Sequence, residues 1–295
     1  MKKIIEGITK HFLPFPIIIC LISILLPGQY LNLSVQGNQE LDRPGDQPVA
    51  DAEENIIIGE QGEKIYLKEK KIEIDGLISN PTWPLELLAC AEGGKDYESL
   101  VVMQCRPQTI HLALALFGLK EGLGGPVYFG DLTKPTGDLV LVLMEWEQKS
   151  YRAEDLVLDA RTNQPMERVG WSFTASEFVD EIDPDTGEPT GRRFYSANST
   201  KTIIATYHDP SAILDNPGLA GGFKNIYFPN KELLPEKGTK IKIIIRVPDE
   251  KELKELVKIN QEVDRREREL LQKMKELSPA DGPPKEKENH PEQKQ

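Results

Sequence analysis

Few residues of this 295-residue chain have the types and spacing that chemistry requires. Its four histidines are scattered, and its three cysteines are too few for a four-thiolate zinc or iron–sulfur site. We therefore expect no metal and no cofactor. No serine lies in the G-x-S-x-G context of a nucleophile elbow, so the sequence assigns no catalytic residue.

The loop EGGKDYES, residues 92–99, is the most informative surface feature. Two glycines expose backbone N–H groups beside Lys95, an arrangement that can receive an anionic group. The loop lacks the G-x-x-x-x-G-K-[ST] pattern of a phosphate-binding P-loop. A hairpin turn with solvated charges is the competing interpretation.

Glu98 leaves the same loop, and His111 lies early in the apolar segment that follows. If both pointed into one polar pocket, they could bind a ligand or, with Cys90, form an incomplete metal site. A hydrogen-bonded core histidine is the competing explanation. Lys95, Glu98 and His111 are thus the candidate ligand-binding residues. A metal-assisted enzyme or binder using Glu98 and His111 is the alternative to a non-catalytic protein.

Cys90 and Cys105 leave two alternatives open. A disulfide is the first consideration in an oxidising compartment. A hairpin turning at Gly93-Gly94 would place Cys105 several residues beyond the partner of Cys90, whereas a turn at Tyr97 would make the two cysteines opposite partners. Two ordinary buried thiols are the favoured expectation.

Three further features have simple structural explanations. Asp183, Asp185 and Glu188 invite a calcium interpretation, but they lack the twelve-residue loop and indicate a hairpin turn. His208 precedes an aspartate that is better explained as a helix cap than as a catalytic partner. Trp83 stands between two prolines and could face a surface groove, although core packing is favoured.

Alternating apolar and charged residues predict the strands that must position these groups. A turn at Gly93-Gly94 would join two of the strands as a hairpin. Pro107 begins a helix that is apolar nearly all round and is therefore expected to be buried. The expected strands cover 65–74 (a strand pair), 85–90, 99–105, 138–147, 170–176, 192–197, 200–208 and 240–247. The pattern predicts an α+β fold, with a mostly antiparallel sheet and one buried helix, plus a C-terminal amphipathic helix.

Composition sets the domain organisation. A basic N-terminus followed by the apolar residues 12–26 is typical of an export signal, either cleaved or retained as a membrane anchor. The bulk of the chain would then lie in the periplasm or cell envelope. We expect a signal or anchor, a polar linker, an α+β domain, an amphipathic helix and a disordered tail over 1–28, 29–60, 61–248, 249–278 and 279–295.

The C-terminal helix has two open interpretations. Leu256, Val263, Leu270 and Leu277 occupy one heptad position, while the second seam position is only half apolar. The helix is either solvated or docked on the body, or it self-associates as a short coiled coil through 253–277. The net charge of −12 argues against a nucleic-acid partner.

Four blocks of the chain carry a resemblance to a known family. They are CAEGGKDYESLVVMQCRPQTIHLALALFGLKEG, VGWSFTASEF, YHDPSAILDNP and LLPEKGTKIKIIIRV, in that order. The sequence resembles the YdjY-type domain family of bacterial envelope proteins over roughly 65–248. This resemblance implies no reaction, substrate or catalytic residue. We therefore expect a non-catalytic binding or assembly module whose partner, a protein or a small ligand, the sequence does not identify.

Overall fold

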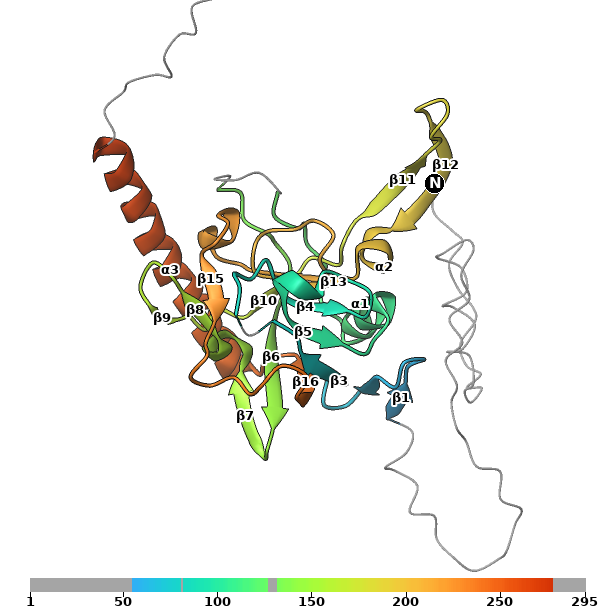
Figure 1. Cartoon of the computed structure of the whole chain (residues 1–295), viewed down its shortest axis with the longest axis horizontal. Coiled ribbons are helices and arrows are strands. Elements are labelled where there is room, and N and C mark those ends of the chain that lie inside the picture. Colours follow the sequence, from blue (N-terminus) through green and yellow to red (C-terminus); the bar gives the residue numbers. More distant parts are fainter. Residues whose placement is uncertain (1–54, 81, 127–131, 278–295) are drawn as a thin grey trace, which may run out of the picture. The chain divides into compact units, whose positions relative to one another are not determined.

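The computed structural model describes residues 55–80, 82–126 and 132–277 (Figure 1). The predicted signal or anchor, most of the linker and the C-terminal tail lie outside these residues. Within the described ranges, no helix has both the length and the apolar character that a membrane span needs.

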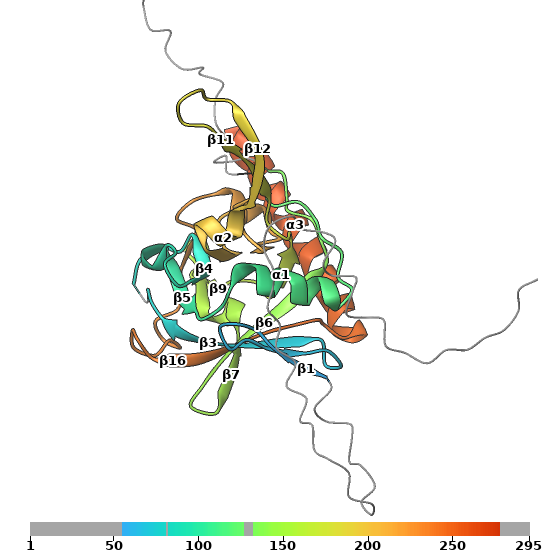
Figure 2. The ribbon, with the colours of Figure 1, turned by 90° about the vertical axis from the view of Figure 1, so that its right-hand side faces the viewer.

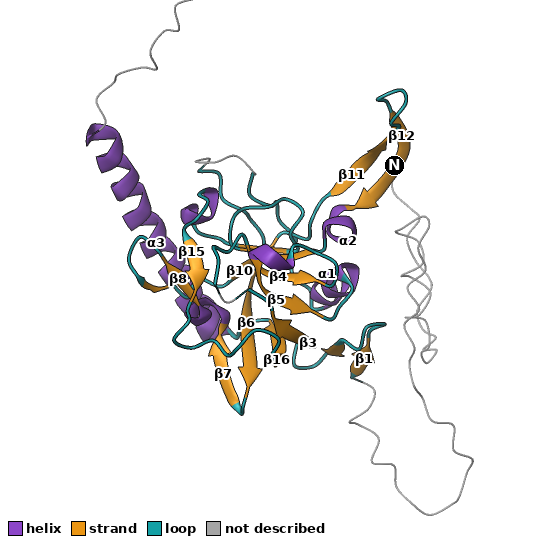
Figure 3. Ribbon diagram, viewed as in Figure 1, coloured by secondary structure: helices purple, strands orange, loops and turns teal. Residues whose placement is uncertain are grey.

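Strands dominate the described part of the chain (Figure 3), and eight of them form a closed ring. Each pairs with the next, and β5 pairs with β3 as well as with β4, which closes the ring. In ring order the strands are β3 (Lys71–Ile78), β16 (Lys240–Arg246), β6 (Leu139–Trp146), β10 (Trp171–Phe173), β14 (Leu214–Asp215), β13 (Thr202–Ala205), β4 (Leu87–Ala91) and β5 (Ser99–Met103). The fold is therefore mostly β with a closed eight-stranded barrel, and the predicted α+β fold is wrong.

Closure depends on the end of β3. Most of β3 pairs with β16, and its last three residues also pair with β5. A Cβ atom at Gly76 would lie 2.6 Å from Cδ1 of Ile243 and 2.7 Å from the carbonyl oxygen of Val102, so only glycine fits between these two neighbours. Side-chain alternation reports which residues face inward, but it carries no information about such distant pairing. This is why the sequence predicted strands without predicting the barrel.

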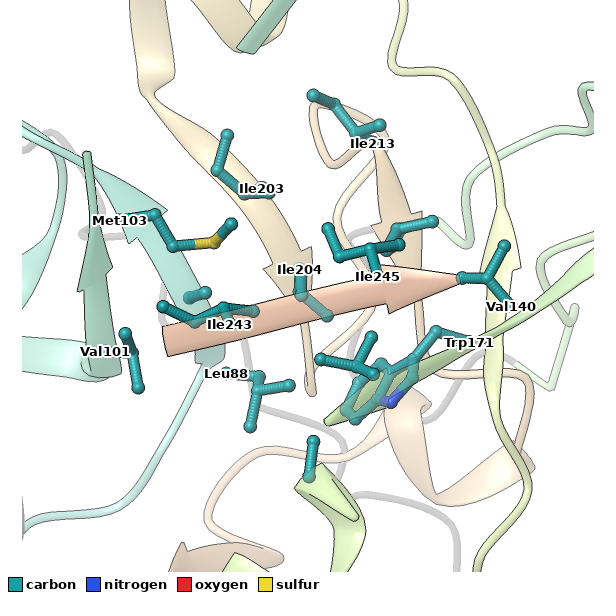
Figure 4. Packing of buried hydrophobic residues seen from close by; sticks show 14 of the residues in the cluster. Leu88, Val101, Met103, Val140, Trp171, Ile203, Ile204, Ile213, Ile243 and Ile245 are labelled. Atoms are coloured by element: carbon teal, nitrogen blue, oxygen red, sulfur yellow. The ribbon is translucent and has the colours of Figure 1, made fainter. Parts of the chain in front are cut away.

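The inward side chains of the ring make the core (Figure 4). Leu88, Val101, Met103, Trp171 and Ile243 come from β4, β5, β10 and β16, and all are buried. Because the sheet closes on itself, its own side chains fill the interior, and no helix is needed to cover an inner face.

The remaining elements extend this barrel. β1 (Ile56–Ile58) and β2 (Lys64–Tyr66) continue the sheet beyond β3, and β7 (Lys149–Arg152) pairs with β6. The hairpin of β11 (Phe178–Ile182) and β12 (Pro189–Tyr195) stands clear of the barrel (Figures 1 and 2). The smaller elements are β15 (Tyr227–Pro229), β8 (Val157–Asp159), β9 (Gln164–Pro165), α2 (Ser196–Thr200), and the 3₁₀ turns η2 (Asp96–Glu98), η3 (Ala153–Leu156) and η4 (Leu219–Gly222).

β4 and β5 are parallel, so the predicted hairpin between them is wrong. Parallel neighbours normally need a connection of about a dozen residues or more, whereas residues 92–98 suffice here. A Cβ atom at Gly94 would lie 3.0 Å from Cβ of Cys90 and 3.0 Å from the carbonyl oxygen of Ala91. The glycine lets the loop run back tightly over the end of β4 and return to the start of β5.

Helix α1 (Pro107–Leu116) confirms the helix predicted from Pro107, but its burial differs from the prediction. Ile110, Ala113 and Leu114 are buried, whereas Leu116 is 50% exposed. The helix lies on the barrel with one face in solvent, since the closed sheet leaves no inner layer for an all-apolar helix.

Helix α3 (Glu250–Leu277) confirms the predicted C-terminal helix and docks on the body. Leu256 and Val263 are buried, and the side-chain amide of Asn260 donates to the carbonyl oxygen of Val169 at 2.8 Å. The carboxylate of Asp264 accepts two hydrogen bonds from Lys134, at 2.7 and 2.6 Å. The docked alternative is therefore confirmed for this stretch, and self-association stays a prediction.

Candidate functional site

The parallel register of β4 and β5 places two glutamates side by side. Leu87 is the register partner of Ser99, so Glu86 and Glu98 precede neighbouring strands at the same edge. The N–H of Glu86 donates to the carbonyl oxygen of Glu98 at 3.2 Å. A hairpin would not have brought these two residues together.

Each glutamate has a lysine partner. Nζ of Lys224 lies 2.8 Å from Oε1 of Glu86, and Nζ of Lys95 lies 3.5 Å from Oε2 of Glu98. Burial raises the pKa of Glu98, and the negative charge of Glu86 raises it further, against the opposing effect of Lys95. The hydrogen bond to Glu86 raises the pKa of Lys224. We call Lys224, Glu86, Glu98 and Lys95 the charged row. Its two positive and two negative groups sum to zero.

Two exposed aromatic residues lie in the segments that carry the charged row, Tyr97 between Lys95 and Glu98 and Trp83 three residues before Glu86. Trp83 is 69% exposed and Tyr97 is 63% exposed. The favoured prediction that Trp83 packs in the core is therefore wrong; the residue is on the surface, and the surface groove of the alternative stays a prediction. We call Trp83, Tyr97 and the charged row together the platform.

Asn80 fixes the backbone beneath both rings. Its side-chain amide, itself only 5% exposed, donates to the carbonyl oxygens of Trp83 at 3.4 Å and Tyr97 at 3.0 Å. Its Oδ1 accepts the N–H groups of Thr82 and Trp83, at 3.2 and 3.0 Å. One buried side chain thus ties two loops that are separate in the sequence, and the rings stay in solvent on a fixed backbone.

Two buried serines add to this rigidity. The hydroxyl of Ser79 donates to the carbonyl oxygen of Asp96 at 3.0 Å, and that of Ser99 donates to the carbonyl oxygen of Lys95 at 2.7 Å. The loop 92–98 is therefore anchored from below; Lys95, Asp96 and Tyr97 are exposed, and Glu98 is half-buried. Backbone N–H groups of Gly94, Asp96 and Glu98 bond within the loop, so they are not available to an anion there.

The platform is an open surface. Two shallow hollows of about 460 and 300 Å³ lie elsewhere on the described surface. One is formed at the start of α3 by Asp249 and its neighbours, and the other at the turn between β6 and β7. Neither is lined by a residue of the platform, whose two rings are largely exposed.

His111 lies away from the platform. Its Nε2 is 2.7 Å from Oε1 of Glu121 and its Nδ1 is 3.0 Å from the hydroxyl of Tyr195. Glu98 pairs with Lys95 and is not among the polar partners of His111. The predicted pairing of Glu98 with His111 is therefore wrong, while Lys95 and Glu98 do meet.

The contacts of His111 hold neighbouring segments of the fold together. The Tyr195 hydroxyl donates to the carbonyl oxygen of Ala175 at 2.9 Å and also lies within hydrogen-bond distance of Nδ1 of His111. The imidazole thereby links α1 to the loop that carries Glu121 and to the base of the β11–β12 hairpin. This explains a polar residue on α1 without a ligand.

Both described cysteines are buried free thiols, which confirms the favoured alternative. Burial raises the pKa of Cys90 and of Cys105, and the charge of Glu63 adds to the increase at Cys105. Neither thiol is therefore set up as a nucleophile. Across the described ranges, no three His, Cys, Asp or Glu side chains are arranged to hold a metal ion.

The predicted calcium candidates form a hairpin turn, as expected. Oδ1 of Asp183 accepts the N–H groups of Asp185 at 2.8 Å and Thr186 at 3.0 Å, in the tip between β11 and β12. The carboxylate is engaged in closing the turn.

A buried polar cluster surrounds His208, which is fully buried. Its Nε2 lies 3.1 Å from the carbonyl oxygens of both Asn216 and Gly218. The neighbouring Asp209 accepts the N–H of Ser211 at 2.8 Å in a turn. The prediction that a helix begins at Asp209 is therefore wrong. Burial raises the pKa of Asp215 to about 8, although the N–H groups of Gly125 and Asn216 oppose this increase. This cluster holds loops together inside the fold.

Sequence reasoning missed three members of the site. Asn80, Glu86 and Lys224 meet the loop 92–98 only through the parallel register and the return of a distant chain segment. The proline-flanked Trp83 was a usable signal for Asn80, since asparagine commonly begins such turns. Nothing local to Glu86 or Lys224 marked them.

The fold and the site define a small β-barrel domain that carries an open aromatic and charged face. The chain belongs to the YdjY domain family, whose model matches residues 52–246, more than half of the chain. The match confirms the resemblance of the four sequence blocks, and it ends where β16 ends, before α3. No curated protein and no solved structure matches the chain.

Proposed function

We propose that this chain is an exported, non-catalytic binding module of the cell envelope and that the platform is its interaction surface. The observation that carries the proposal is the exposure of Trp83 and Tyr97 on a backbone fixed by the buried Asn80. Trp and Tyr dominate binding energetics because each ring buries a large area at little cost in conformational freedom. A fixed backbone lowers the entropy lost on binding.

The proposal that the module is non-catalytic is supported by the exposure of the platform to solvent. General acid–base and electrostatic catalysis gain their strength where water is excluded. The side chains of Glu86 and Glu98 are each 26% exposed, and each is already paired with a lysine. These are the features of recognition and not of bond breaking.

Export is supported by the basic N-terminus and the apolar residues 12–26. Alkaline phosphatase, which is active only outside the cytoplasm, fused after residue 60 should be active. An inactive cytoplasmic fusion protein would contradict export. The mass of the mature N-terminus would separate cleavage from anchoring.

The interaction surface can be tested without knowing the partner. A photo-crosslinking amino acid at position 83 of the full-length chain, irradiated in producing cells, should give discrete adducts. The same amino acid at Leu123, which is 78% exposed but distant from the platform in sequence, is the matched control. Tyr97→Ala should reduce the adducts at position 83. Equal labelling at both positions would contradict the proposal.

A further inference from the structure

We infer that the platform binds a neutral carbohydrate chain; this inference rests on the proposed function and names the ligand class for the same surface.

Charge disfavours ionic ligands, because the exposed Asp96 of the same turn, the two glutamates and the two lysines present both signs. An anionic ligand would face the carboxylates of Glu86 and Glu98, and a cationic ligand would face the ammonium groups of Lys95 and Lys224. A hydroxyl group can donate to a carboxylate and accept from an ammonium group. Neighbouring hydroxyls of a neutral sugar can therefore use both kinds of group, and bonds to ionised partners are the stronger kind.

The rings suit the same ligand. A pyranose ring presents C–H groups on its face, which form an apolar surface of about the size of an aromatic ring. Trp83 and Tyr97 offer exposed rings in the same chain segments that carry Glu86, Lys95 and Glu98. A sugar laid on a ring keeps its hydroxyl groups at the ring's edge, where they can form hydrogen bonds to polar side chains.

The mixture of rings and charges disfavours a protein partner. The desolvated centre of a protein–protein interface is depleted of Lys and Glu. Here Lys95 and Glu98 flank Tyr97 and Glu86 follows Trp83 by three residues, so a protein that covered the rings would also strip water from these charges. A carbohydrate leaves room for water, and water-mediated hydrogen bonds are nearly as favourable as direct ones.

The open shape favours a polymer. Sites for single small molecules are usually concave and bury most of the ligand. The platform buries one side of whatever lies on it, so several sugar units in a row are needed to gather enough contact. A glycan chain meets this requirement, whereas a monosaccharide does not.

The test is titration of the full-length chain with cellohexaose, chitohexaose and maltohexaose. Trp146 and Trp171 are buried, so a change in tryptophan fluorescence on binding reports Trp83. Titration calorimetry measures the affinity of the variants for the same oligosaccharides. Trp83→Ala and Glu98→Gln should each weaken binding by about tenfold or more, the loss that a hot-spot side chain causes. Leu123→Ala, an exposed apolar control, should bind as the natural chain does.

Three outcomes decide between the proposals. Binding of at least one hexasaccharide with this variant pattern supports the inference. No binding by any of the three at millimolar concentration, or tighter binding of the anionic oligogalacturonate, overturns it. In that case, protein adducts at position 83 would leave the proposed function standing with a protein partner. Absence of both binding and adducts would remove the proposed function as well.

Discussion

The buried side-chain amide of Asn80 holds the backbone of the platform in place. Other buried polar side chains of the molecule hold loops in the same way. Asn80 uses both its donor and its acceptor atoms on the backbone of two loops. Glu63 acts similarly at α1, where its carboxylate accepts the N–H of Arg106 at 2.7 Å and that of Gln61 at 2.9 Å. Buried polar groups need such partners, because an unpaired one costs about 1–3 kcal/mol. Exposed residues are thereby left free to meet a ligand.

Glu252 offers the clearest prediction at the residue scale. Arg246 donates to its carboxylate at 2.7 and 2.6 Å, and the N–H of Asp249 donates at 2.9 Å. These hydrogen bonds, the arginine's first, lower the pKa of Glu252 to about 2. A folded pKa below the unfolded value stabilises the protein above the unfolded pKa, and this contribution is lost as pH falls from about 4.5 towards 2.

Glu252→Gln should lower the free energy of unfolding at pH 7 by about 1–2 kcal/mol, discounted because the pair is partly exposed. It should also flatten the loss of stability between pH 4.5 and 2. Urea denaturation at a series of pH values measures both effects. Glu250→Gln is the control, since the pair of Glu250 with Lys254 is almost fully exposed. Equal stability of Glu252→Gln and the natural chain at pH 7 would contradict the prediction.

At the scale of elements, the sequence predicted strands well and pairings poorly. The strands over 65–74, 138–147 and 240–247 are confirmed by β2 with β3, by β6 and by β16, because alternation is a local property. The parallel pairing of β4 with β5 and the closure through Gly76 are not local, and the usual rules for connections point the other way. The residues of the site were likewise predictable only where they lie in one local segment. Lys95 and Glu98 were found from their own loop, whereas Glu86 was not.

Gly76 gives the prediction for the barrel. Gly76→Ala places a methyl group within 2.7 Å of Ile243 and Val102, so β3 and β5 must separate or the core must shift. Overpacking of this kind costs about 1–3 kcal/mol. We expect Gly76→Ala to lower the free energy of unfolding by this amount in chemical denaturation. The adjacent Leu77→Ala, at an exposed position, should have a much smaller effect. If the order were reversed, the close approach would not be what closes the barrel.

At the scale of the whole molecule, α3 extends the family domain. The matched region ends at Arg246, and α3 then docks on the body. Glu267 accepts the N–H of Ala220 at 3.2 Å and a hydrogen bond from Arg161 at 2.9 Å. Ala220 belongs to η4, whose Gly221 packs against the ring of His208. The helix therefore fastens a loop of the barrel in addition to burying its own apolar side chains.

Docking of α3 on the body and self-association of α3 as a coiled coil predict different effects of substitutions at its heptad residues. Val263 is buried against the body, whereas Leu270, one heptad later, is 48% exposed. Val263→Glu buries a charge and should lower the free energy of unfolding by about 2–4 kcal/mol. Leu270→Glu should change it by no more than about 0.5 kcal/mol, as surface substitutions do.

Light scattering of the chain from residue 52 onward should give a monomer mass with and without Leu270→Glu, because docking already uses Leu256 and Val263. A larger mass in the natural sequence that Leu270→Glu returns to a monomer would instead show that the exposed part of α3 pairs between copies.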